Sequence, residues 1–173
     1  MLEKDMRRLK MGDSSALVDI YKETKKAVFA VCYTMVRDYS LAEDMMQDTY
    51  LRVDRYIAHY KEQYKAKAWI LRIAKNICLN EIKKRKREVF SESAIDKQQG
   101  FEEIKAHDES GIIAAVIKNL KENESQIVLM HTLGDISLKE IAQLTGKPSA
   151  TIRWQYNNAL KKLRKRIKQE DVL

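Results

Sequence analysis

The segment Ser137–Leu163, SLKEIAQLTGKPSATIRWQYNNALKKL, constrains the fold of this chain more than any other stretch. Ala142 supplies the small side chain that a first short helix needs where it packs against its neighbour. Gly146 follows four residues later at a turn, and Ile152 lies six residues further, inside a second helix. This spacing predicts two helices joined by a tight turn. The segment is therefore predicted to be a helix-turn-helix.

The ends of the predicted helices carry matching signals. Ser137 and Glu140 are three residues apart and form a capping box, the usual start of a helix. Pro148 and Ser149 stop the first helix and offer a side-chain oxygen to cap the second. The second helix, with the basic tail that follows it, is a candidate DNA reader, because the recognition helix of such a motif enters the major groove.

Composition and charge favour an all-α protein with two basic units. The 173 residues include only five Gly and one Pro, and the formal charge is +8. Residues 1–88 carry 20 basic and 13 acidic groups, residues 89–109 carry 2 and 6, and residues 110–173 carry 11 and 6. Basic blocks on either side of an acidic connector are suited to binding a polyanion such as DNA. Net charge alone is equally consistent with a surface that is merely well solvated.

Several classes of protein have no support in the sequence. We expect a cytoplasmic location, because no leader and no membrane-spanning apolar run is visible. Cys32 and Cys78 lie on apolar helix faces without metal-ligand spacing and are expected to be core thiols. The three histidines are scattered, and there is no glycine-rich phosphate loop. We therefore expect no enzyme activity, no metal and no cofactor.

Hydrophobic periodicity predicts two groups of helices. The first group has a helix capped by Asp13 or Ser14 and running to about residue 37, a helix opened by a Ser40–Glu43 capping box and running to about residue 58, and a helix carrying Trp69 that ends in the basic run 83–87. We expect these to form a three-helix bundle over residues 1–88, with Trp69 in its core. Residues 89–110 read as an acidic linker. Residues 111–173 then form a four-helix domain, with helices over 112–124 and 125–135 under the helix-turn-helix.

These residues together resemble a known family. The run AEDMMQDTYLRV (42–53), then AWILRIAKNICLNEIKKRKR (68–87), an acidic linker and the helix-turn-helix are similar in order and spacing to a group 4, or extracytoplasmic function (ECF), sigma factor of bacterial RNA polymerase, in the sigma-70 family. The resemblance spans nearly the whole chain. It implies that residues 1–88 correspond to sigma region 2 and residues 111–173 to sigma region 4.

The resemblance implies that region 2 docks on the clamp helices of the largest polymerase subunit. Residues on the second helix fall at spacings that can form one polar face. From spacing alone a solvated face is the better interpretation, but Asp44 and Gln47 occupy the family's acidic docking motif. The polymerase-binding candidates are Glu43, Asp44, Gln47, Asp48 and Arg52.

Region 2 of the family also recognises and melts the −10 promoter element. Melting without ATP requires that extruded bases be captured, because unstacking costs a few kcal/mol. The loop 59–67 combines aromatic rings with cations, and the next helix carries a polar stripe that could follow the single strand. The −10 candidates are Tyr60, Lys61, Gln63, Tyr64, Lys65, Lys67, Arg72, Lys75, Asn76, Asn80 and Lys83.

Region 4 of the family reads the −35 element and contacts the polymerase flap. The recognition-helix candidates are Ser149, Thr151, Arg153, Trp154, Gln155 and Asn158, with Lys147 and Lys161 on the DNA backbone. Arg153 or Gln155 could make bidentate base contacts. Two departures from the family pattern leave upstream specificity open: Ala150 replaces the usual glycine, and Trp154 stands where a small residue is common. Trp154 either packs on a thymine methyl or sugar, or supports the helix.

The expected partners are core RNA polymerase, double- and single-stranded promoter DNA and an anti-sigma factor, with no membrane insertion. As a further hypothesis, the acidic linker, with Glu92, Asp96, Glu102 and Glu103, crosses the basic RNA-exit region of the polymerase by mimicking nucleic acid. Two alternatives remain at this point. A dimeric helix-turn-helix regulator explains the second domain alone, and an α-helical protein whose basic surfaces bind RNA or acidic proteins explains the charge.

Overall fold

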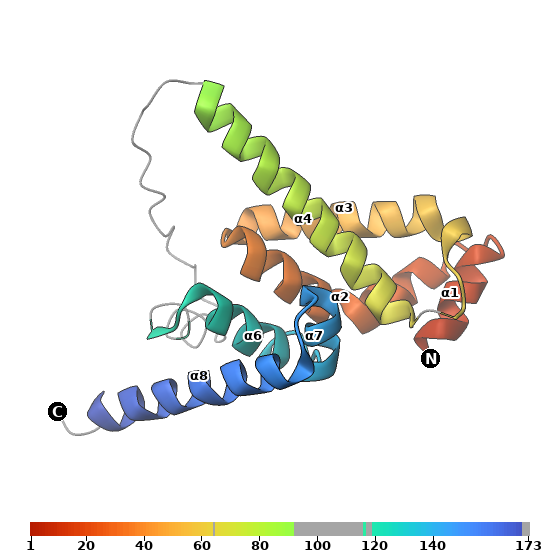
Figure 1. Cartoon of the computed structure of the whole chain (residues 1–173). Helices are drawn as coiled ribbons and strands as arrows, with labels where there is room; N and C mark the ends of the chain where they lie inside the picture. Colours follow the sequence, from red (N-terminus) through yellow and green to blue (C-terminus); the bar gives the residue numbers. More distant parts are fainter. Residues whose placement is uncertain (64, 92–115, 117–118, 171–173) are drawn as a thin grey trace. The chain divides into compact units, whose positions relative to one another are not determined.

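The computed structural model describes residues 1–63, 65–91, 116 and 119–170, and every regular element in these ranges is a helix (Figure 1). The chain divides into two compact units, Met1–Glu102 and Glu103–Leu173. The prediction of an all-α protein with two domains is confirmed. The acidic residues named for the linker hypothesis lie outside the described residues.

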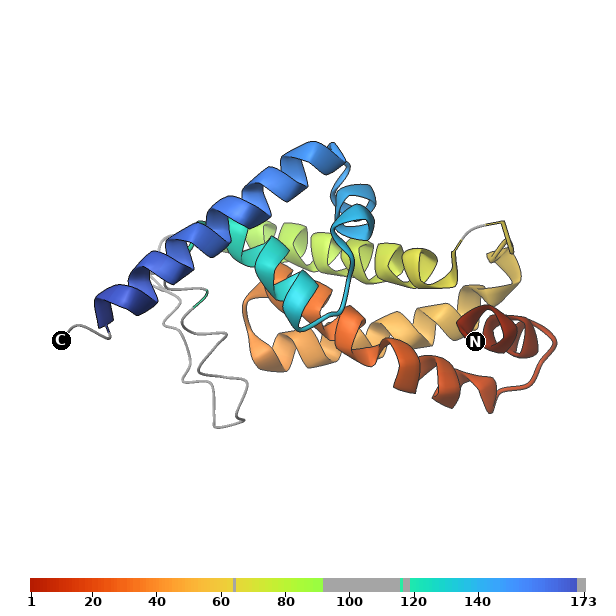
Figure 2. The same cartoon turned by 90° about the horizontal axis from the view of Figure 1, so that it is seen from below.

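The first unit is built on three long helices, α2 (Ala16–Val36), α3 (Tyr39–Tyr56) and α4 (Ala66–Ser91), which pack against one another (Figure 2). A 3-10 turn, η1 (Ile57–His59), leads from α3 towards α4. The core between the long helices is apolar, and removal of that surface from water is the main stabilising contribution. Its most deeply buried side chains include Ile20, Val28, Val31, Val53, Ile70 and Leu71. Cys32 and Cys78 are buried thiols, as expected.

A short helix that the sequence reading missed, α1 (Leu2–Lys10), precedes α2 and packs against it. Its buried apolar residues are Leu2, Met6 and Leu9, at a spacing of four and three residues, and the rest of the segment is mostly charged. The helix is only nine residues long, shorter than the window over which helical periodicity is usually judged. Among the described residues, the expected three-helix bundle is thus four helices with a 3-10 turn.

Two predicted helix starts are wrong in detail. Helix α2 begins after Ser15, whose amide N–H donates to Asp13 Oδ1 at 3.1 Å, so the expected cap at Asp13 or Ser14 lies one or two residues early. Helix α3 does not begin with a Ser40 capping box. Asp38 is its N-cap and accepts a hydrogen bond from the Leu41 amide N–H at 2.8 Å.

The second unit contains α6 (Glu122–Thr132), α7 (Leu138–Thr145) and α8 (Ser149–Glu170), each packed against the other two. Helix α6 begins at Glu122 rather than at Ser125, and the extended N-cap Lys121 interrupts the helix expected over 112–124. Residues 112–115, 117 and 118 of that expected helix lie outside the described residues. The core residues Ile127, Val128, Leu129, Ile136, Ile141, Ile152 and Ala159 are buried. None of the helices within the described ranges is long and apolar enough to cross a membrane.

Candidate nucleic-acid interface

The turn between α7 and α8 has the geometry predicted from the sequence. Ser137 Oγ accepts from the Glu140 amide N–H at 3.2 Å, and Glu140 Oε2 accepts from the Ser137 amide N–H at 2.9 Å, which completes the capping box. Gly146 ends α7 at φ 71°, a left-handed conformation that glycine adopts at little cost. Ala142 and Ile152 are buried between the two helices.

Helix α8 begins at Ser149, so this residue lies in the first turn of the helix rather than at the cap before it. The Ile152 amide N–H donates to the Pro148 carbonyl at 3.2 Å and closes this turn. The side chains of the first two turns that face solvent carry both hydrogen-bonding and aromatic groups. The exposed predicted residues of α8 are Ser149, Thr151, Arg153, Trp154 and Lys161.

Trp154 is 67% exposed, which argues against a role in supporting the helix. A ring that supports the helix would be packed against its own unit. Trp154 instead presents its large apolar surface to solvent, one residue after the Arg153 guanidinium. An exposed indole is suited to contact with a base or a sugar, because its apolar ring can stack or pack on either.

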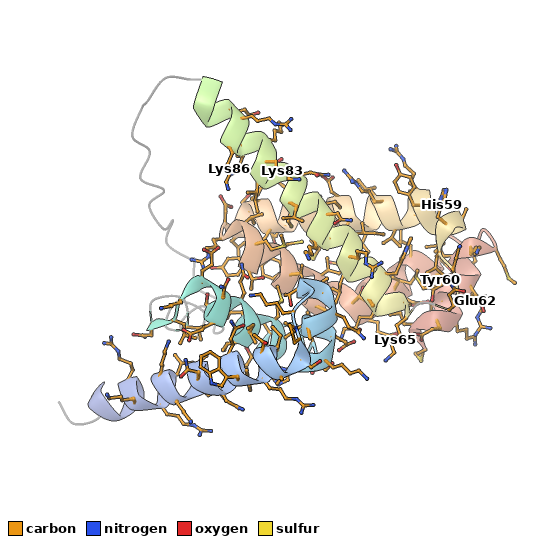
Figure 3. All side chains as sticks on the ribbon, in the orientation of Figure 1. His59, Tyr60, Glu62, Lys65, Lys83 and Lys86 are labelled. Atoms are coloured by element: carbon orange, nitrogen blue, oxygen red, sulfur yellow. The ribbon has the colours of Figure 1, made fainter. Side chains whose placement is uncertain are left out.

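A second polar surface lies on the first unit, in the loop between η1 and α4 and along α4. Figure 3 shows Tyr60, Glu62 and Lys65 at one end of α4, with Lys83 and Lys86 towards its other end. Lys61, Gln63 and Lys65 are exposed, and Tyr64 lies outside the described residues. On α4 itself the exposed predicted residues are Arg72, Asn76, Asn80 and Lys83, whereas Lys67 and Lys75 are half-buried.

Tyr60 does not fit its expected role. Its side chain is only 1% exposed, and its ring lies 5.4 Å from the Trp69 ring at an interplanar angle of 57°. Burial, followed by the nearby Glu3 and Glu62 carboxylates, raises the pKa of the Tyr60 hydroxyl. We had expected this ring to receive a base, but it belongs to the core of the first unit, together with the half-buried Trp69.

Helix α3 presents a polar face on the side away from the core. Met45, Thr49 and Val53 are buried on its inner side. The five residues predicted for docking are all exposed on its outer side: Glu43, Asp44, Gln47, Asp48 and Arg52. The structure adds an apolar group that the sequence reading missed, because Leu51 lies seven residues after Asp44 on this face and is 69% exposed.

Two family models match separate parts of this chain. The profile for Sigma-70 region 2 matches residues 20–88, and that for Sigma-70 region 4 matches residues 110–163, which together cover more than half of the chain. The chain belongs to the sigma-70 family of sigma factors. The first match contains α3 and most of α2 and α4, and the second contains α6, α7 and most of α8. Helix α1 precedes both.

Curated relatives match this sigma factor over most of their own length. The ECF RNA polymerase sigma factor SigW of Bacillus subtilis is 23% identical, with 97% of each chain covered. SigM of the same organism is 25% identical over 87% of this chain and 91% of its own. SigK of Mycobacterium tuberculosis is 23% identical over 94% and 91%.

Solved structures share the fold of this sigma factor. The structure of CnrH in complex with the cytosolic domain of CnrY has a TM-score of 0.68 and 14% identity, and covers 96% of this chain and 97% of that one. The sigma factor RpoE in complex with the anti-sigma factor NepR from Bartonella quintana has a TM-score of 0.63 and 21% identity, and covers 86% and 94%.

Two of the predicted recognition residues of this sigma factor face its own second unit. Asn158 is half-buried and its Nδ2 donates to Glu124 Oε1 at 3.2 Å. Gln155 is also half-buried, and its Oε1 is enclosed without a hydrogen-bond partner. An enclosed carbonyl oxygen without a donor is costly, and a bidentate base contact by Gln155, which uses both amide atoms, requires this side chain to turn outward. Lys147, at the turn, is half-buried as well.

Glu124 is the residue that sequence reasoning missed in this unit. Its carboxylate is buried on α6 and accepts hydrogen bonds from Lys162 Nζ on α8 at 2.7 and 2.9 Å. Burial by itself raises the pKa of Glu124, but the hydrogen bonds from Lys162, the Lys121 amide N–H and Asn158 outweigh it, so the pKa lies below its ordinary value. This cluster fixes α8 on the helix beneath it.

Proposed function

We propose that this sigma factor binds core RNA polymerase and directs it to promoters that carry −10 and −35 elements. One observation supports the proposal more than the others: the two units of this chain carry different DNA-binding features. The first unit has a surface suited to single-stranded DNA, and the second has a capped helix-turn-helix with an exposed recognition helix. A regulator that binds duplex DNA alone would need only the second. The role is regulatory rather than catalytic, and we place it in the cytoplasm, where the polymerase works.

The −10 element is captured by the loop after Tyr60 and by the outer face of α4. Strand opening is unfavourable unless the extruded bases and their phosphates find new partners. Lysine ammonium groups neutralise phosphates, and asparagine and glutamine side chains can hydrogen-bond to base edges. We assign this role to Lys61, Gln63, Lys65, Arg72, Asn76, Asn80 and Lys83, all of which are exposed. Tyr64 remains the aromatic candidate.

The −35 element is read by the first two turns of α8. Residues near the N-terminus of a recognition helix reach base edges, and cations further along meet phosphates. Arg153 is the strongest candidate for a bidentate base contact, which discriminates against a wrong base by about 1–3 kcal/mol. Trp154 adds an apolar contact to a thymine methyl or a sugar. Gln155 and Asn158 are assigned a supporting role because they face the protein.

Docking on the polymerase uses the outer face of α3. Its acidic and amide groups suit a charged helical surface such as the clamp helices, and exposed Leu51 gives the patch an apolar centre. A desolvated apolar group within a polar rim is the usual anatomy of a protein interface. We also propose that an anti-sigma factor controls the protein, a proposal supported by the structural neighbour RpoE, whose complex is with the anti-sigma factor NepR.

Run-off transcription from fragmented genomic DNA tests the proposal. Purified bacterial core polymerase is assayed with and without the protein, and new start sites are mapped. New starts that share two spaced upstream elements are expected. Stable DNA binding without new starts, together with a dimer in solution and a symmetric site, would instead establish the dimeric regulator. Binding to unrelated nucleic acids with equal affinity would establish the RNA- or acidic-protein-binding alternative.

A further inference from the structure

Helix α1 lies against the part of the first unit from which the loop after Tyr60 emerges. Besides packing on α2, α1 contacts both η1 and α4, the two elements that this loop connects. Figure 2 shows the N-terminal helix beside this end of the unit. An element that contacts both of the helices flanking a loop can restrict the conformation of that loop.

The C-terminal end of α1 is held in place by an ionic cluster around Arg8. The guanidinium lies 3.0 Å from Asp5 Oδ1, 2.9 Å from Asp13 Oδ2 and 3.0 Å from Asp19 Oδ2. These carboxylates come from α1, the connection and α2. Single surface ion pairs contribute little, but a guanidinium shared by several carboxylates restricts geometry more effectively. The cluster therefore fixes α1 on α2 two residues before Lys10.

Lys10, the last residue of α1, reaches the loop directly. Its Nζ donates a hydrogen bond to the main-chain carbonyl of Tyr60 at 2.8 Å, across 50 residues of sequence. The Tyr60 ring is buried against Trp69, so the residue is held by both its main chain and its side chain. The exposed residues Lys61, Gln63 and Lys65 follow immediately.

We propose that Lys10 is a positioning residue for capture of the melted strand, an inference that rests on the proposed −10 role of this loop. Lys10 fixes the carbonyl from which the loop departs, and Tyr60 acts as the buried anchor beside it. A loop ordered before it meets DNA loses less conformational entropy on binding. Removing the Lys10 contact is therefore expected to impair strand capture more than association with duplex DNA.

The contact itself is tested on the free full-length protein by hydrogen exchange with mass spectrometry. Lys10→Met removes the donor but keeps the aliphatic stem, and Lys10→Arg retains a cationic donor. Lys4→Met is the matched control, since Lys4 is exposed on the same helix and the change in charge is identical. Faster exchange over residues 60–65 in Lys10→Met alone is expected. Equal exchange in all four proteins would overturn the contact.

The role is tested with core polymerase on a promoter obtained by run-off transcription, with permanganate reactivity of −10 thymines as the measure of opening. Lys10→Met is expected to lower opening about three- to tenfold while affinity for core polymerase is unchanged, and Lys10→Arg is expected to restore it. Normal opening by Lys10→Met, or an equal loss in Lys4→Met, would overturn the inference. If wild-type protein opens no promoter, the proposed function fails first, and the exchange experiment still judges the Lys10 contact separately.

Discussion

Lys162 on α8 donates from its Nζ to both carboxylate oxygens of Glu124 on α6, at 2.7 and 2.9 Å. The two residues are 38 positions apart, and the bond ties the reading helix to the helix beneath it. Asn158, one turn earlier on α8, donates to the same carboxylate. The orientation of the first turns of α8 thus depends on a buried anion that does not itself face DNA.

Glu124→Gln is expected to destabilise the second unit by about 1–2 kcal/mol. The substitution keeps the shape but removes the charge that three donors share, and the partly exposed Lys162 limits the loss through solvent screening. Hydrogen exchange of α6 and α8 amides at neutral pH gives the change in opening free energy. The control is Glu122→Gln, an exposed glutamate in the same first turn, for which a change below about 0.5 kcal/mol is expected. Similar losses in both variants would contradict a specific role for Glu124.

Acidification should weaken the second unit through the same carboxylate. Because the pKa of folded Glu124 lies below its ordinary value of 4.5, its contribution is present in full above that value and is lost as pH falls through the lowered folded pKa. NMR peak intensities of α6 and α8 amides during urea titrations at pH 7, 5, 4 and 3 measure this loss. Glu124→Gln should show a smaller loss below pH 4.5. An unchanged pH dependence in this variant would assign the acid sensitivity to other groups.

The helix-turn-helix could be predicted in detail because its determinants are local. The Ser137–Glu140 capping box and the left-handed Gly146 each act within a few residues, so the sequence window contains both partners. The cap of α3 could not be predicted in the same way, because Asp38 and Ser40 are both good caps and lie two residues apart. The αL conformation of Arg37 ends α2 and places Asp38 at the N-cap of α3.

The burial of Tyr60 and the Glu124 cluster could not be predicted in the same way. Tyr60 lies in a polar stretch of sequence. It is held in the core by contacts that this stretch does not show, with α1, a helix that was not predicted, and with Trp69. Asn158 looked like a base reader because it lies on the recognition helix, but its partner is 34 residues away on α6. Whether a polar side chain on a helix faces solvent or hydrogen-bonds within the protein depends on such long-range partners. Helical periodicity does not show them.

Docking on core polymerase should depend on Asp44. Asp44→Lys reverses a charge at the centre of the outer face of α3, and repulsion from a basic partner surface is expected to weaken binding at least tenfold. The protein should remain folded, because the side chain is exposed. Fluorescence anisotropy of labelled protein titrated with core polymerase gives the dissociation constant. Glu23→Lys, exposed on α2 and so outside the predicted docking face, is the control, and equal weakening by both would point to a general charge effect.

Arg153→Ala should lower discrimination at one position of the −35 element by about 1–3 kcal/mol. The loss follows from removal of a bidentate donor at the start of the reading helix, whereas Arg164, exposed three turns later, can meet only phosphates in the same arrangement. Arg164→Ala should therefore weaken all −35 sequences by a similar factor and reduce the salt dependence of binding. Transcription from a promoter library with a randomised −35 element, read by sequencing, separates the two effects. An unchanged base preference in Arg153→Ala would assign upstream specificity to Trp154 and its neighbours instead.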